Sequence, residues 1–333
     1  MSSTRLVPET RLMSSDELSA DDAWHTLRRQ GGWSLLRDAF IRFRYGDGFS
    51  HSRAFALQLC LAVVPFMIAL TGLITELGVE EGGQVVADTV LALTPGQSEQ
   101  MVRELLSDGE RTEEAGELAL TLGLLTGLVA LTTTMAQIER GANRIYGVER
   151  DRPALAKYVR AAVLAVTAGV PALAGFLILV GGGAIGASVQ RHYEWGDFAG
   201  GVWAVVRWPL SLALTVVAVS VIFRRAPRRN QPGLSWLFFG GGIATALWWL
   251  ASLLLAAYVR FSDGFGQTYG ALTGMMALLL WANLTGMALF GGLSFAAQLE
   301  AMRIGVHEPA QPDLWEPESE REPLLDTGEM TSL

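Results

Sequence analysis

The segment Leu234–Ala257 reads LSWLFFGGGIATALWWLASLLLAA and contains no charged residue. A run of about 18 or more apolar residues is long enough to cross the hydrocarbon core of a membrane as an α-helix. Arg224, Arg225, Arg228 and Arg229 precede this run, whereas Arg260 is the one basic residue in the connection that follows it. Because basic residues stay in the cytoplasm, we expect a membrane-spanning helix whose amino-terminal end is cytoplasmic.

Five further segments have the same character, and the chain as a whole is 50% hydrophobic and only 17% charged. Soluble domains carry about 25% charged residues. The sequence therefore predicts an all-α, polytopic membrane bundle with six transmembrane helices. The predicted spans are residues 54–75, 118–138, 161–180, 202–223, 234–257 and 271–295.

The basic residues between the predicted spans alternate from one connection to the next. Residues 28–53, 140–160 and 224–229 contain 16 Lys and Arg, whereas residues 76–117, 185–199 and 258–270 contain four. The positive-inside rule places the first group in the cytoplasm. We therefore expect a multi-pass protein of the cytoplasmic membrane with both termini in the cytoplasm.

The segments outside the spans suggest three further parts. Apolar residues recur at helical spacing from Trp24 to Phe43 with arginines between them, which predicts an amphipathic cytoplasmic helix that either lies in the membrane interface or packs under the bundle. Residues 76–117 hold two apolar stripes separated by Thr94-Pro95-Gly96 and predict an outer helical hairpin. We expect a membrane domain over residues 23–304, between a flexible tail over residues 1–22 and a disordered acidic tail over residues 305–333.

The residues that usually carry enzyme chemistry are scattered. No H-E-x-x-H, G-x-S-x-G or Walker A motif is present, and the four histidines have no metal-ligand spacing. The one cysteine, Cys60, lies in an apolar run, and the net charge of −8 does not favour a nucleic-acid partner. We expect no enzyme activity, no metal and no cofactor. Membrane lipids are the expected partners, and a homo-oligomer stays open.

The few polar side chains inside the predicted spans allow two interpretations. Gln58, Thr133, Gln137 and Asn283 either form hydrogen bonds between helices or line a polar path through the bundle. No Asp or Glu lies in the core of a span, which speaks against a proton-driven pump.

Arg207 is the one arginine inside a predicted span, next to Trp208 and Pro209. It either extends toward the membrane interface beside aromatic residues or contacts an anionic headgroup. Candidate headgroup contacts at the basic connections are Asn143, Arg144, Arg224 and Arg228. Pro65, Pro171 and Pro209 are expected to kink their helices, because proline removes a backbone hydrogen bond.

Several segments between Trp33 and Arg303 resemble the YihY/BrkB family of bacterial inner-membrane proteins. The segments that carry the resemblance are Arg53–Leu57 with Val64-Pro65, Gly141–Val148, Gln231-Pro232-Gly233, Thr268-Tyr269-Gly270 and Gln298-Leu299-Glu300. The chain departs from the family pattern at Leu61-Ala62, where relatives often have Leu-Ser, and at Gly292-Leu293-Ser294, where many have Gly-Ala-Glu.

The resemblance implies six spans with cytoplasmic termini. Relatives were once labelled ribonuclease BN, but the residues of this chain give that activity no support. Some relatives are associated with the cell envelope and with lipid export. We therefore expect a transporter, or a transport-associated protein, for a lipid-like or envelope-related amphipathic molecule. The alternative is a membrane scaffold that binds partners through its outer hairpin or its acidic tail.

Overall fold

The computed structural model describes residues 19–30, 32–76, 113–148, 151–193, 197–261, 273–303, 305 and 308–310. All regular secondary structure in this part of the chain is helical. The predicted outer hairpin and most of the two predicted tails lie outside the described residues.

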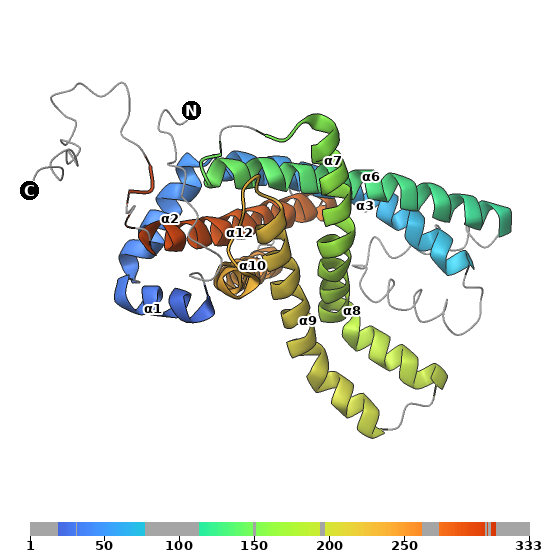
Figure 1. Cartoon of the computed structure of the whole chain (residues 1–333). Coiled ribbons are helices and arrows are strands. Elements are labelled where there is room, and N and C mark those ends of the chain that lie inside the picture. Colours follow the sequence, from blue (N-terminus) through green and yellow to red (C-terminus); the bar gives the residue numbers. More distant parts are fainter. Residues whose placement is uncertain are drawn as a thin grey trace, which may run out of the picture.

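The helices follow the chain in a simple order (Figure 1). Their bounds are α1 Ala20–Gln30, α2 Trp33–Tyr45, α3 Gly48–Glu76, α6 Glu113–Ile145, α7 Ala154–Leu164, η2 Ala165–Gly169, α8 Val170–Tyr193, α9 Asp197–Arg225, α10 Leu234–Phe261 and α12 Thr273–Arg303.

A π-helical turn precedes the predicted kink at Pro171. The π-helical turn η2 joins α7 to α8 without a break, and Pro171 follows directly as the second residue of α8. A proline ring crowds the carbonyl four residues earlier, here Thr167, and a wider π turn relieves that contact. Pro65 and Pro209 lie inside α3 and α9.

Five helical stretches in the described part are long and apolar enough to cross a membrane: Leu120–Ile145, Ala154–Leu179, Phe198–Arg225, Leu234–Val259 and Gly274–Arg303. Each coincides with one of the predicted spans. The predicted span 54–75 lies inside α3, which is not among these five. The helices run past the predicted ends, because hydropathy falls at charged residues that are nevertheless helical and, in α12, buried.

Helix pairs build the bundle. Figure 1 shows α3, α6 and α12 side by side, while α8 and α9 form a hairpin that leaves this layer at an angle. Helix α10 packs along α12 and α9, and α2 packs against α12. Small residues permit the closest approach: a Cβ on Gly292 of α12 would lie 2.5 Å from the Ala244 Cβ of α10.

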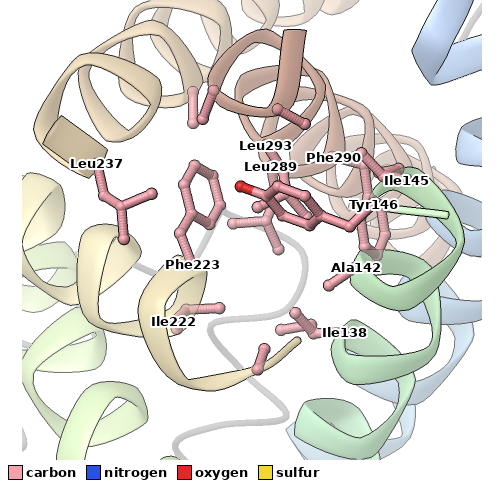
Figure 2. Packing of buried hydrophobic residues seen from close by; sticks show 14 of the residues in the cluster. Ile138, Ala142, Ile145, Tyr146, Ile222, Phe223, Leu237, Leu289, Phe290 and Leu293 are labelled. Carbon is pink, nitrogen blue, oxygen red and sulfur yellow. The ribbon is translucent and has the colours of Figure 1, made fainter. Parts of the chain in front are cut away.

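The buried core lies at the end of the bundle where α6 and α9 end and α10 begins. Trp236, Phe223, Tyr146 and Phe290 are among its largest buried side chains. Figure 2 shows the Tyr146 ring at the end of α6 with its hydroxyl group directed toward Phe223. Away from this core, α10 exposes large side chains such as Leu253 and Leu254, as expected of a helix surrounded by lipid.

The N-terminal amphipathic segment is two helices, α1 and α2, because Gly32 with a φ of 135° interrupts it. The apolar residues of α2 face two ways. Leu35, Ala39 and Phe43 are buried, whereas Trp33 and Phe40 are exposed. Helix α2 therefore packs on the bundle through one face and leaves a second apolar face uncovered in the described structure.

Candidate functional site: an arginine pocket beside a buried ion pair

The connection between α9 and α10 is rich in arginine and proline. It reads RRAPRRNQPG over residues 224–233. Pro227 and Pro232 keep the chain from continuing as a helix, since proline has no amide hydrogen and restricts the residue before it. Four arginines are thereby gathered at the end of two candidate spans.

A pocket of about 410 Å³ opens beside this connection. Its polar lining consists of Arg160, Arg224, Arg225, Arg229, Asn230 and Gln231. Val221 and Leu234 supply its apolar lining. We call this site the arginine pocket. Its lining contains no Asp or Glu among the described residues, so its electrostatic potential favours an anion.

Arg152, which precedes α7, and Arg160, which lies within it, hold the end of α9. Arg152 donates to the carbonyls of Ala226 at 3.0 Å and Pro227 at 2.8 Å, and it pairs with the buried Glu139 at 3.0 Å. The Arg160 Nε donates to the Arg225 carbonyl at 3.1 Å. The last carbonyls of a helix lack intrahelical donors, and cations there interact favourably with the helix dipole. These bonds fix one wall of the pocket.

Asn143 and Asp151 hold the chain next to the pocket. The Asn143 side chain accepts the Arg228 amide hydrogen at 2.7 Å and donates to Asp151 at 2.8 Å. Lys157 pairs with the Asp151 carboxylate at 2.7 Å. Partial burial raises the pKa of Asp151, but the hydrogen bonds from Lys157 and Asn143 outweigh it, so the net pKa lies below the usual value.

Behind the pocket lies a buried polar cluster of Arg42, Tyr146, Arg229, Gln298 and Glu300. Arg229 forms a salt bridge with Glu300, whose side chain is fully buried, and the Arg229 guanidinium lies 4.6 Å over the Tyr146 ring. Arg42 of α2 donates to Gln298 of α12 and to the Ile145 carbonyl, both at 3.0 Å. Burial lowers the pKa of Arg42 to about 10 and raises that of Tyr146.

The buried polar cluster leaves several polar atoms unsatisfied within the described structure. One terminal nitrogen of Arg42, the second carboxylate oxygen of Glu300 and the Tyr146 hydroxyl are buried without a hydrogen-bond partner. The Gln231 amide lies near the Tyr146 hydroxyl but is not positioned for a well-formed hydrogen bond. Gln231 therefore links the cluster to the pocket that it lines.

The candidate headgroup residues occupy different places. Arg224 lines the arginine pocket. Asn143 and Arg228 lie beside it, with Arg228 donating to the Asp151 carbonyl at 2.7 Å. Arg144 is exposed and pairs with Asp47 at 3.4 Å, away from the pocket lining.

Arg207 belongs to a separate part of the molecule. It lies in α9 with its guanidinium 5.4 Å from the Trp208 ring and packs on Gly182 and Gly183 of α8. Its Nε is buried without a hydrogen-bond partner in the described structure.

Of the four residues of the predicted polar path, Gln58 and Thr133 contact each other, whereas Gln137 contacts His51. Thr133 donates to Gln58 at 3.0 Å, and Gln137 lies 2.9 Å from the ring of His51. The Asn283 carbonyl oxygen is buried, and no hydrogen bond among the described residues joins it to either pair. A continuous path through these four residues stays a prediction.

The sequence did not identify a functional group made of Arg42, Tyr146, Gln231 and Glu300. Three of these residues, Tyr146, Gln231 and Glu300, nevertheless lie in segments that carry the family resemblance. A usable signal was present in α12. Glu300 falls seven positions after Leu293 and four after Ala296, on the buried face of the helix. An acid on such a face needs a buried cation as partner.

The comparisons with known proteins point to one family. The family model described as "Virulence factor BrkB" matches residues 39–316. The chain is 25% identical over 259 residues to "Putative ribonuclease-like protein YfkH" of Bacillus subtilis, covering 78% of this chain and 92% of that protein. No solved structure matches.

Two further relatives carry the name "UPF0761 membrane protein". The protein of Chromohalobacter salexigens is 26% identical over 80% of this chain and 63% of its own length. The protein of Azoarcus is 26% identical over 79% of this chain and 64% of its own length. The chain thus spans a little under two thirds of these two relatives. With five candidate spans and a family match over most of its length, the chain is a multi-pass membrane protein that belongs to the BrkB/YihY family.

Proposed function

We propose that this chain moves, or helps to move, a lipid-like amphipathic molecule across the bacterial cytoplasmic membrane. The observation that carries the proposal is the arginine pocket at the end of three candidate spans, next to apolar side chains that face the lipid. A protein that handles an anionic amphiphile needs a cationic site for the headgroup and an apolar surface for the chain. The arginine pocket offers both.

The proposal includes six membrane spans with α3 as the first. Helix α3 has 29 residues, hence a length of about 43 Å, which exceeds the roughly 30 Å of a hydrocarbon core. It packs along α6, which is itself long and apolar enough to span. Six spans place both termini on one side, and the 16 basic residues of the inner connections assign that side to the cytoplasm. The arginine pocket is then cytoplasmic.

We also propose that the chain is not an enzyme, ribonuclease included. The sequence carries no hydrolase motif, and the arginine pocket holds cations without a carboxylate or histidine as general base in its described lining. RNA cleavage by the purified chain that is abolished in a pocket variant would contradict this proposal.

Reconstitution tests the proposed transport. Vesicles with and without the purified chain carry a trace of phosphatidic acid labelled with a fluorophore near its headgroup, and a membrane-impermeant quencher reports how fast the label changes leaflets. We expect the wild type to accelerate the exchange. The variant Arg224→Gln/Arg225→Gln should lose most of this acceleration, because the pocket loses two exposed guanidinium groups.

The matched control is Arg44→Gln/Arg53→Gln. Both arginines are exposed, belong to the same set of basic connections and lie outside the arginine pocket. This variant removes the same charge and should keep the wild-type rate. If neither the wild type nor any variant accelerates exchange of a labelled anionic lipid, the transport proposal fails.

A further inference from the structure

We infer that the arginine pocket selects a phosphomonoester or diphosphate headgroup over a phosphodiester headgroup. The inference rests on the proposed function for the view that the bound lipid is cargo. The selectivity itself stands on the charges and contacts of the pocket and can be tested without any transport measurement.

The charge of the pocket exceeds what one phosphodiester neutralises. Arg229 already pairs with Glu300, whereas Arg160, Arg224 and Arg225 are exposed and face no carboxylate in the described lining. The buried Glu139, whose charge acts on Arg160, is paired with Arg152. Three guanidinium groups in one pocket repel one another. A phosphodiester offers one negative charge, whereas a phosphomonoester carries about −1.5 to −2 at neutral pH.

Two of these arginines are held in place by neutral groups, so no acid in the described lining neutralises their positive charges. The Arg160 Nε donates to the Arg225 carbonyl at 3.1 Å, which leaves the two terminal nitrogens of Arg160 available to bind a ligand. The Arg225 guanidinium lies 3.4 Å from the Thr167 hydroxyl. Guanidinium groups bind phosphate oxygens in pairs, and a phosphomonoester presents three terminal oxygens to such forks.

Neutral donors complete the lining. Asn230 and Gln231 both line the pocket. Asn230 is exposed, so its amide can donate to a bound oxygen acceptor, whereas the polar atoms of Gln231 are buried near the Tyr146 hydroxyl. The pocket volume of about 410 Å³ also falls in the range of small-molecule sites, roughly 300–1,000 Å³.

The surroundings indicate that the phosphate is attached to a lipid. Val163, Val217 and Phe238 are exposed by 52%, 43% and 40%. They lie three or four positions from the lining residues Arg160, Val221 and Leu234, so each shares a helix face with one of them. All three belong to candidate membrane spans. An acyl or isoprenoid chain leaving the pocket therefore meets an apolar surface on α7, α9 and α10.

Equilibrium binding to the purified full chain tests the inference. The probes are short-chain phosphatidic acid, phosphatidylglycerol with the same chains, and inorganic pyrophosphate. We expect the wild type to bind phosphatidic acid at least about tenfold more tightly than phosphatidylglycerol, as for a charge-assisted contact. Arg224→Gln/Arg225→Gln should lose about that factor for phosphatidic acid, whereas Arg44→Gln/Arg53→Gln should stay within about twofold of the wild type.

The lysine variant Arg224→Lys/Arg225→Lys guards against a folding defect. It keeps both charges but loses the guanidinium forks, so it should retain part of the selectivity for phosphatidic acid. Pyrophosphate should compete with phosphatidic acid. If pyrophosphate alone binds as tightly as the lipid, the ligand is a soluble phosphate compound and the lipid assignment is wrong.

Equal affinity for the two lipids, or an unchanged pocket variant, overturns the inferred selectivity. Selective binding without leaflet exchange in the vesicle assay would reject the proposed transport and leave this inference standing. Leaflet exchange without selective binding would reject the inferred selectivity and leave the proposed transport standing.

Discussion

The arginine-rich end of the bundle and the α8–α9 hairpin hold the polar atoms of their arginines in opposite ways. At the arginine-rich end, Arg229 and Arg152 each pair with a buried acid, and Arg42 bonds to Gln298 and a backbone carbonyl. In the hairpin, Arg207 lies on two glycines and beside Trp208, and its Nε has no hydrogen-bond partner in the described structure.

This difference separates a fixed region from an adaptable one. A buried ion pair with several additional bonds has one good arrangement, and removing one partner leaves a desolvated charge. An arginine on a glycine surface can shift along it at little cost. We therefore expect substitutions in the buried ion pairs Arg229–Glu300 and Arg152–Glu139 to change stability. Substitutions around Arg207, like those of the exposed pocket arginines, should change ligand handling more than stability.

Glu300→Gln should have the largest effect on stability. The substitution keeps the shape of the side chain but leaves Arg229 buried without its negative partner. Loss of one partner of a buried ion pair costs about 3–5 kcal/mol. Thermal unfolding of the purified chain should show a correspondingly lower melting temperature.

The double variant Glu300→Gln/Arg229→Gln is the control for this prediction. It removes both charges, so it should be more stable than Glu300→Gln alone. If Arg229→Gln lowers the stability of Glu300→Gln by as much as it lowers the stability of the wild type, the two residues do not interact.

Gly292→Ala should have the next largest effect. A Cβ at this position would lie 2.5 Å from the Ala244 Cβ and 2.6 Å from the Gly240 carbonyl, so α10 and α12 must move apart. Overpacking of this kind costs about 1–3 kcal/mol. Gly242→Ala on α10 is the matched control because nothing lies within 4 Å of its Cβ. It should be neutral or slightly stabilising, as alanine favours helices.

The candidate membrane spans could be predicted from the sequence because the free energy of transferring a side chain into lipid depends mainly on that side chain itself. Hydropathy located the segment of every candidate span, although it ended the last one at residue 295 while α12 continues to Arg303. Glu300 lies in that extension. Its charge is tolerated in the helix because Arg229, 71 positions earlier, packs against it.

The arginine pocket could be predicted only in part. Charge patterning identified Arg224 and its neighbours as basic, but it could not place Arg160 of α7 against the Arg225 carbonyl. Nor could it bring Arg42 to Gln298, because those residues are separated by 256 positions. Such contacts depend on how α2, α7, α9 and α12 pack, which no local pattern in a single sequence encodes.

Arg207→Gln should change stability little and leaflet exchange more. No acid among the described residues is paired with Arg207, so we expect the free energy of unfolding to change by less than about 1 kcal/mol. If Arg207 contacts the moving headgroup, exchange of labelled phosphatidic acid should slow severalfold. Gly183→Ala is the companion variant, because its Cβ would lie 2.7 Å from an Arg207 nitrogen and displace the guanidinium. Wild-type exchange in both variants would leave Arg207 as a residue that only extends toward the interface.

Asp151→Asn should have the smallest effect, and it should depend on pH. The pKa of Asp151 lies below the ordinary 3.8, because hydrogen bonds from Lys157 and Asn143 outweigh the opposing effect of burial. A lowered carboxyl pKa contributes stability above the ordinary value, and this contribution is lost as the pH falls through the lowered one. The melting temperature of the wild type should therefore exceed that of Asp151→Asn near neutral pH and converge on it below pH 3.8. A difference that stays constant down to the acid limit of folding would mean that Asp151 acts through its shape and not its charge.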